Sequence, residues 1–136
     1  MEKKYMDLSL AYALVAMALG VFYREYTKLS GFAGATRLSV LHTHYFMLGM
    51  FFFLVLALAE KAFQFSDKAA GRTALVYQVG LNITGLGLLV RGLTQVWGGE
   101  LSRGMDASLS GVSGIGHILL GVAMVMLLLK IRKKAA

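Results

Sequence analysis

The chain is most informative between Val40 and Glu60, where it reads VLHTHYFMLGMFFFLVLALAE. This run is long enough for a membrane-spanning helix, which needs about 20 mainly apolar residues. It also carries His42 and His44 in its opening turns. Because an α-helix has about 3.6 residues per turn, side chains two positions apart point to roughly opposite faces. The stretch therefore predicts a spanning helix that offers one imidazole on each side.

The composition of the whole chain extends this prediction. Of its 136 residues 57% are hydrophobic and 15% are charged, and the mean hydropathy is +0.66. A soluble domain of this size is far less apolar. Four stretches are apolar enough to cross a bilayer, and they cover residues 8–23, 38–59, 74–96 and 112–129. We therefore predict an all-α, integral membrane four-helix bundle in a single domain.

The charged residues indicate how this bundle is oriented. Lys and Arg concentrate at the N-terminus, between the second and third apolar stretches, and in the C-terminal tail. Cytoplasmic segments of membrane proteins carry this excess, so both termini are predicted to be cytoplasmic (N-in/C-in). The net charge of +7 is explained by orientation, and no soluble basic module suggests a nucleic-acid partner. Because the chain has no cysteine, thiolate metal sites and covalent haem attachment are excluded.

Glycines accompany the histidines at helical spacing. Gly49 lies one heptad beyond His42, and Gly114 and Gly121 lie three residues before and four residues after His117. Residues at these spacings share a helix face. We therefore expect each of these two histidines to face a surface without large side chains, which leaves room for a neighbouring backbone or a flat ligand.

Depth in the membrane brings these residues together. In the predicted topology His42, His44 and His117 lie within one or two turns of the same level, in the outer half of the bilayer. The third helix brings Arg91 to that level, and the end of the first helix supplies a charged cluster consisting of Arg24, Glu25 and Lys28. Since ionisable groups inside a bilayer are costly and usually mark a site, the sequence predicts one at this level.

The segment Val40 to Tyr45, VLHTHY, followed by Met50 and Phe53, resembles the helix of the haem-copper oxidase catalytic subunit whose His-x-His-Tyr pair ligates two haems. The resemblance implies that His42 and His44 are each an axial haem ligand. It further implies that four helices correspond to one third of a twelve-helix arrangement, assembled as a homotrimer with haem between protomers. The oxidase's copper-ligating histidine pair has no counterpart here, so oxygen reduction by this chain alone is not expected.

Three segments, GVFYREYTK (20–28), LSVLHTH (38–44, which overlaps the stretch above) and GIGHILLG (114–121), together resemble a family of small, uncharacterised four-span bacterial membrane proteins. This resemblance extends over most of the chain. It implies a multi-pass protein of the bacterial plasma membrane, and it implies no function.

Haem chemistry matches the residues independently of either resemblance. A b-type haem needs one or two neutral imidazoles, a flat space, and cations for its propionates. His42, His44 and His117 are the candidate ligands, Gly49, Gly114 and Gly121 provide the space, and Arg91, Arg24 and Lys28 provide the cations. We therefore predict a haem-binding membrane protein for electron transfer or for gas or redox binding, with a redox partner.

Two alternatives remain open. The three histidines, with Glu25 as a further ligand, would suit non-haem Cu or Zn, and Met47 or Met50 could supply a thioether to copper. A cofactor-free bundle could instead relay protons or transport a solute through its histidines. Whether the protein is an enzyme is also open. If haem is bound, His42→Ala and His44→Ala should lose it, whereas Met124→Leu should retain it.

Overall fold

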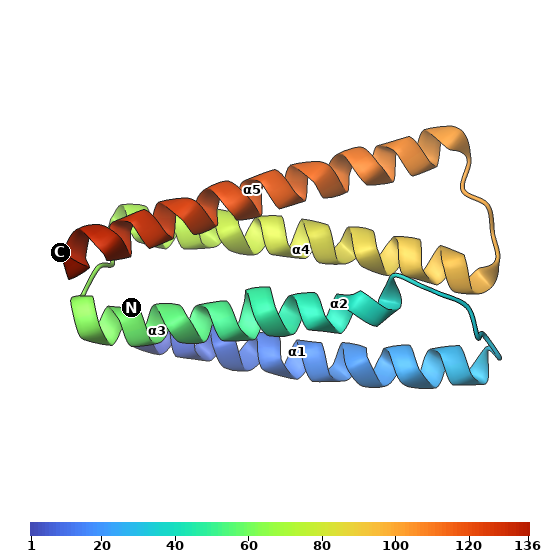
Figure 1. Cartoon of the computed structure of the whole chain (residues 1–136), viewed down its shortest axis with the longest axis horizontal. Helices are drawn as coiled ribbons and strands as arrows, with labels where there is room; N and C mark the ends of the chain where they lie inside the picture. The colour runs from blue at the N-terminus through green and yellow to red at the C-terminus, as the bar shows by residue number, and fades with distance from the viewer.

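The computed structural model describes residues 1–136 as an all-α protein without strands (Figure 1). Its elements are α1 (Glu2–Leu29), α2 (Leu38–His44), η1 (Tyr45–Phe51), α3 (Phe52–Phe63), α4 (Lys68–Trp97) and α5 (Arg103–Ala135). Because α2, η1 and α3 follow one another without a break, they form a single long helix over residues 38–63. The chain thus has four helices that are long and apolar enough to cross a membrane, as predicted.

The helices extend beyond the predicted apolar stretches because helical structure continues into their polar ends. The fourth stretch was predicted from residue 112, whereas α5 begins at Arg103, where Ser102 accepts a hydrogen bond from the backbone N–H of Met105 (3.3 Å). The helix before it, α4, ends at Trp97, and the next residue, Gly98, has a φ of 69°, in the left-handed region that glycine tolerates. Hydropathy marks the part of a helix that suits lipid, whereas caps and turns decide where the helix stops.

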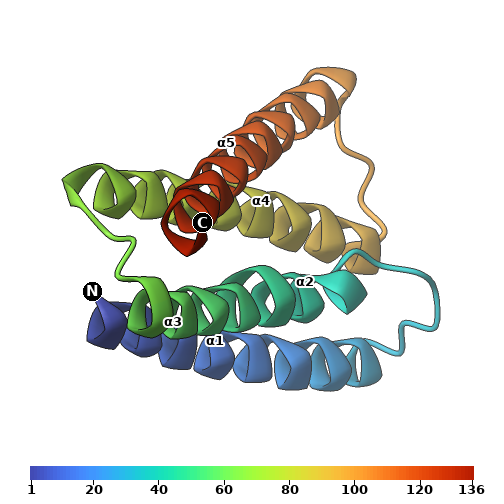
Figure 2. The same ribbon diagram turned by 60° about the vertical axis from the view of Figure 1, so that its left-hand side comes forward.

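The helices associate as two pairs (Figure 2). α1 packs along α2, η1 and α3, and α4 packs along α5. The α5 helix crosses α4 and diverges from it toward the Arg103 end (Figures 1 and 2). Where α4 and α5 meet, Gly80 and Gly116 let the two backbones touch, because a Cβ on Gly80 would stand 2.6 Å from the backbone nitrogen of Leu120. Small residues at such crossings are typical of helix packing in membranes.

The π-helix η1 is stabilised by hydroxyl groups from neighbouring helices. The wider turn of a π-helix disturbs the regular pattern of backbone hydrogen bonds. The Tyr77 hydroxyl donates to the carbonyl of Leu48 (2.6 Å), and the Ser9 hydroxyl donates to the carbonyl of Met50 (2.9 Å). Since unsatisfied backbone groups are costly in a bilayer, these two bonds stabilise the irregular turn and join it to α1 and α4.

A tyrosine pair and one amide connect three helices in the core. Asn82 on α4 donates to the Tyr12 hydroxyl on α1 (3.0 Å), and it accepts a hydrogen bond from the Tyr45 hydroxyl (3.2 Å). The rings of Tyr12 and Tyr45 stack with their centroids 5.9 Å apart. The core is therefore polar at one point, and that point fixes the register of α1, η1 and α4.

Ionic contacts join the ends of α4 and α5 near the chain termini. Asp67 caps α4 by accepting a hydrogen bond from the Ala70 N–H (2.6 Å), and Lys130 donates to both carboxylate oxygens of Asp67 (2.8 and 2.7 Å). The bonds from Lys130 and from the Ala70 N–H lower the pKa of the Asp67 carboxyl below its ordinary value. Asp67 therefore stays charged and connects the two helices outside the apolar region.

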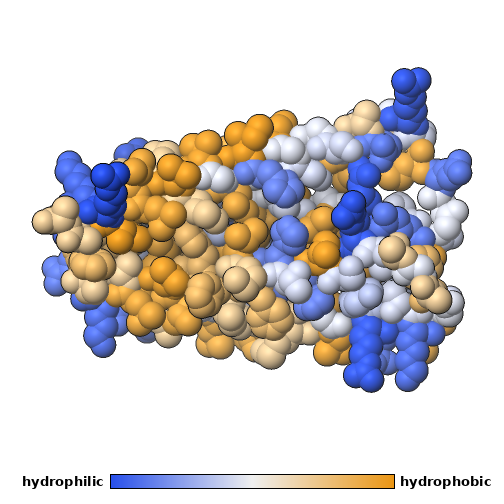
Figure 3. All heavy atoms as spheres, in the orientation of Figure 1, coloured by the Kyte–Doolittle hydropathy of each residue, from blue (hydrophilic) through white to orange (hydrophobic).

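The surface suits a bilayer (Figure 3). The view shows hydrophilic side chains at both ends and an apolar zone between them, and polar side chains extend inward from one end. Many large apolar side chains are exposed on all four of these long helices. In the 18-residue apolar segment of each helix, only 22% to 44% of the residues are buried within the chain. Lipid contact is the arrangement that removes these side chains from water.

Candidate functional site

The three histidines lie at one level of the bundle. Tyr45, next to His44, packs against Gly85 of α4, and Gly116, next to His117, packs against Thr84 of the same helix. His42 precedes His44 by two residues and so lies within the same helical turn. The imidazoles therefore belong to one cross-section of the protein, and they are carried by α2 and α5 on different sides of it.

His42 faces α1. Its ring stacks on Tyr23 with the centroids 6.3 Å apart, and it meets the edge of Phe46 at 6.5 Å. Gly20 makes room for this ring, since a Cβ there would lie 3.5 Å from it. The Nδ1 atom of His42 is buried and has no hydrogen-bond partner. The predicted space beside Gly49 is filled from α1, because a Cβ on Gly49 would lie 2.7 Å from the Tyr12 ring.

His44 lies on the opposite side of α2, away from α1. Its Nδ1 is 2.9 Å from the carbonyl oxygen of Val40. Because a carbonyl can only accept, Nδ1 carries the proton and Nε2 keeps a free lone pair, which is the form in which histidine binds metals. His44 is half-buried, and the residues that follow on its face, Met47, Phe51 and Val55, are exposed. No other helix of the chain covers this face.

His117, on α5, makes the same contact as His44 with the backbone carbonyl four residues before it. Its Nδ1 is 2.9 Å from the carbonyl oxygen of Ser113, so Nε2 is again the free nitrogen. The side chain is exposed, and a Cβ on Gly114 or Gly121 would meet no atom within 4 Å. The helix face beside His117, which was expected to lack large side chains because of Gly114 and Gly121, is therefore open in the single chain.

A polar cavity of about 240 Å³ lies beside His117, between α4, α5 and the start of α2. Its lining residues are Arg37, Thr84, Gly87, Leu88, Arg91, Ser110, Ser113 and His117. The Thr84 hydroxyl is buried there without a hydrogen-bond partner. An orphaned buried hydroxyl is costly in a low-dielectric environment, and a bound polar ligand in the cavity would relieve that cost.

Two arginines give this cavity positive charge. Arg91 is held by α5, with its Nη2 3.0 Å from an Asp106 carboxylate oxygen and 2.8 Å from the Ser110 hydroxyl. Arg37 is exposed, and its side chain has no carboxylate within 4 Å. Its backbone N–H donates to the side chain of Gln95 (2.8 Å), which fixes the start of α2 against α4. Arg37 is the cation of this cavity that remains free to pair with an anion.

The other predicted residues lie elsewhere. Arg24 is 3.8 Å from Glu25, and both side chains are exposed near the end of α1. Lys28 is also exposed in that last turn. None of the three lines the cavity beside His117. No group of three or more His, Asp or Glu side chains converges in a way that could hold a metal ion within one chain.

Arg37, Thr84 and Ser113 were not among the residues predicted from the sequence. Arg37 precedes an apolar stretch, where a single basic residue usually reflects membrane orientation. Thr84 and Ser113 are small hydroxyl residues among glycines, which is the usual composition of a helix–helix contact. Only the divergence of α5 from α4 leaves these side chains around an open space.

Comparison with known proteins identifies the family. Residues 1–134 match the family described as "Protein of unknown function (DUF2871)", and the chain belongs to that family. This agrees with the resemblance to an uncharacterised family, whereas the comparisons give no support to the haem-copper oxidase resemblance. No curated protein and no solved structure matches the chain.

Proposed function

We propose that the protein is a haem-binding membrane protein, in which His44 and His117 are the axial ligand residues and the haem serves electron transfer or gas binding. The observation that carries this proposal is the state of these two imidazoles. Each has its Nδ1 donating to the carbonyl four residues earlier, which leaves Nε2 as the nitrogen available to a ligand. His44 is half-buried on a face without a covering helix, and His117 is exposed beside the cavity between α4 and α5.

The number of ligands also favours haem over a bare metal ion. The macrocycle itself supplies four nitrogens to iron, so the protein has to supply only one or two. A Zn or Cu ion needs three or four protein ligands, and no such group is assembled within one chain. Two separate imidazoles therefore suit haem b better than they suit the non-haem alternative.

The surroundings of His117 suit the other parts of a haem, namely its flat macrocycle and its two propionates. Binding pockets for small molecules typically measure about 300–1,000 Å³, so a cavity of about 240 Å³ holds only part of the cofactor. The rest of the macrocycle could lie against the open, flat surface at Gly114 and Gly121. Arg37, the unpaired cation of the same cavity, is suited by charge to one propionate, and Arg91, whose Nη2 lies 3.0 Å from an Asp106 carboxylate oxygen, would have to exchange that carboxylate for the other propionate. Bound haem would supply a redox-active iron, and its axial ligands and their hydrogen bonds would set its potential.

A second copy of the chain would complete the site. The face that carries His44 and the face that carries His117 are both uncovered in the single chain. If these faces met between protomers, each haem would take one imidazole from each copy. A closed ring of three protomers would then contain twelve spanning helices. We propose this homotrimer in the bacterial plasma membrane with both termini cytoplasmic, which the distribution of Lys and Arg supports.

The test is a visible absorption spectrum of the detergent-purified protein, oxidised and dithionite-reduced, with iron and other metals measured on the same sample. We expect a Soret band that shifts on reduction, with iron near one per site. His44→Ala and His117→Ala should each lose the cofactor or change its spectrum. Met124→Leu, a change in a partly buried packing residue, should leave both intact.

His42→Ala distinguishes the ligand arrangement. The expectation from the sequence is that this variant loses haem. Because the His42 ring packs against Tyr23 and Gly20 of α1, we propose instead that it retains haem. Loss of haem in His42→Ala alone would transfer the ligand role to His42. A protein that is colourless after expression with haem supplied, and that carries stoichiometric copper or zinc, would refute haem in favour of the non-haem site. A colourless, metal-free protein would leave the proton-relay or transport alternative.

A further inference from the structure

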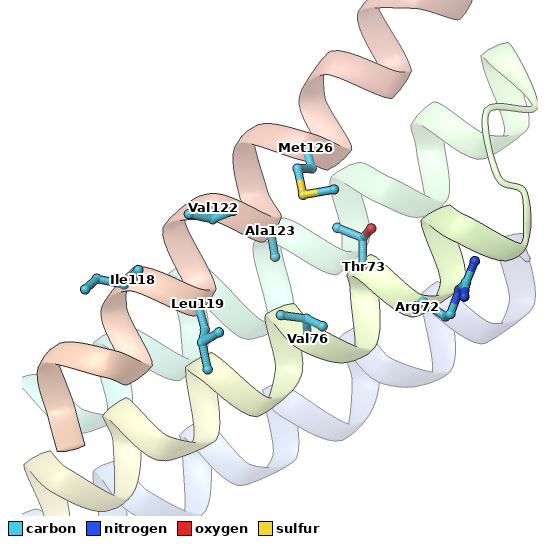
Figure 4. Close-up of a pocket in the computed structure, with 8 residues that line it drawn as sticks. All are labelled: Arg72, Thr73, Val76, Ile118, Leu119, Val122, Ala123 and Met126. Atoms are coloured by element: carbon cyan, nitrogen blue, oxygen red, sulfur yellow. The ribbon is translucent and has the colours of Figure 1, made fainter.

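A second groove lies on the other flank of the α4–α5 pair (Figure 4). It measures about 240 Å³ and is lined by Arg72, Thr73, Val76, Ile118, Leu119, Val122, Ala123 and Met126. Leu119 follows His117 by two residues and so points about 200° away from it around α5. The groove is therefore separate from the histidine cavity and shares no lining residue with it, so binding in the groove does not depend on haem.

The wall of this groove is apolar and open. Ile118, Val122 and Met126 form one stripe along α5 and are 66%, 56% and 48% exposed. At a rise of about 1.5 Å per residue, the stripe is roughly 12 Å long. The only hydroxyl in the lining, that of Thr73, already donates to the Ala69 carbonyl (2.9 Å). The wall is therefore suited to a hydrocarbon chain, and it has no hydroxyl group that lacks a hydrogen-bond partner.

One end of the groove carries a free cation. Arg72 lies four residues into α4, about 6 Å along the helix from its start at Lys68. Its side chain is exposed and has no carboxylate within 4 Å. The neighbouring Lys130, in contrast, is neutralised by Asp67 at 2.7 Å. Arg72 is thus an unpaired guanidinium at the depth where a spanning helix meets lipid headgroups.

We propose that this groove is a binding site for an anionic phospholipid, in which one acyl chain lies along the α5 stripe and the phosphate pairs with Arg72. A guanidinium binds phosphate oxygens in a bidentate manner, and an acyl chain matches a narrow apolar wall in the bilayer. A neighbouring apolar helix would cover the stripe but leave Arg72 unpaired, so charge complementarity favours the lipid.

Native mass spectrometry of the full-length protein in detergent tests the proposal. The protein is incubated with equal amounts of phosphatidylglycerol and phosphatidylcholine that have identical acyl chains. We expect the wild type to retain phosphatidylglycerol in preference. A basic residue near the surface contributes about 1 kcal/mol toward anionic lipid, so Arg72→Gln should weaken phosphatidylglycerol retention about five-fold. Retention of phosphatidylcholine should not change.

Two further variants separate a built site from general attraction. Lys133→Gln removes the same charge from the exposed tail at the same end of α5, and it should have much less effect than Arg72→Gln. Val122→Trp fills the groove from an exposed position and should reduce retention of both lipids. Circular dichroism establishes that each variant keeps its helices. Equal retention of the two lipids by the wild type, equal losses in Arg72→Gln and Lys133→Gln, or full retention in a folded Val122→Trp would overturn the proposal.

Discussion

Replacing Gly80 by alanine should weaken the contact that holds α5 on α4. The added Cβ would lie 2.6 Å from the Leu120 backbone nitrogen, 2.8 Å from the Gly116 carbonyl oxygen and 3.0 Å from the Leu120 Cα. All three atoms belong to the α5 backbone, so no side-chain rotation can relieve the overlap. The two helices would have to separate locally.

The size of the effect follows from these distances. Carbon contacts are most favourable at about 3.5–4.0 Å, so the helices must separate by about 1 Å at this point. Overpacking of this kind costs about 1–3 kcal/mol. Alanine is favoured over glycine in a helix by up to about 1 kcal/mol, which offsets part of the cost. We therefore expect Gly80→Ala to lower the free energy of unfolding by about 1–2 kcal/mol.

The measurement is reversible unfolding in mixed detergent micelles, with helix content followed by circular dichroism. Gly111→Ala is the matched control, because a Cβ at Gly111 meets no atom within 4 Å. That variant should be neutral or slightly stabilised, since it gains only helix propensity. If Gly80→Ala unfolds at the same free energy as Gly111→Ala, the close approach of α4 and α5 does not contribute to stability as argued.

Two further predictions concern the polar contacts between helices. Asn82→Leu should destabilise the fold by about 1–3 kcal/mol in the same unfolding assay, because it leaves the Tyr12 and Tyr45 hydroxyls without their shared partner; unchanged stability would show that the two phenols find other partners. The pKa of Asp67 is lowered in the folded state, so its contribution is present above the ordinary aspartate pKa of about 3.9 and is lost as the pH falls through the lower folded value. Asp67→Asn keeps a helix-capping side chain but removes the charge paired with Lys130. As the pH is lowered from about 5 to about 2, the variant should therefore lose less stability than the wild type. An identical acid profile in the two proteins would refute this role.

Most of the fold could be predicted because hydropathy and length constrain a membrane chain strongly. The four apolar stretches correspond to four helices, and the run from Val40 belongs to the one that carries both histidines in its first two turns. The predicted ends were less accurate, since the caps at Asp67 and Ser102 and the turn at Gly98 depend on local hydrogen bonds and backbone geometry. Hydropathy does not report these.

The candidate site was only partly predictable. The spacing of His42 and His44 indicated opposite faces, and in the structure His42 faces α1 while His44 faces away from it. The sequence could not show that the space beside Gly49 is occupied by Tyr12, or that Arg37 rather than Arg24 lines the cavity near His117. Those relationships join residues that are far apart in the chain.

The sequence by itself determined that the chain has four helices long and apolar enough to cross a membrane, and where along these helices the histidines lie, because the length of an apolar stretch and the helical rise translate directly into position along a helix axis. Only the tertiary structure decided which neighbour each side chain meets. The rotation of each helix about its axis, and the divergence of α5 from α4, are set by the fit of Gly80 against Gly116 and of Tyr45 against Gly85. Such fits depend on pairs of surfaces, and a surface acquires its partner only when the helices pack.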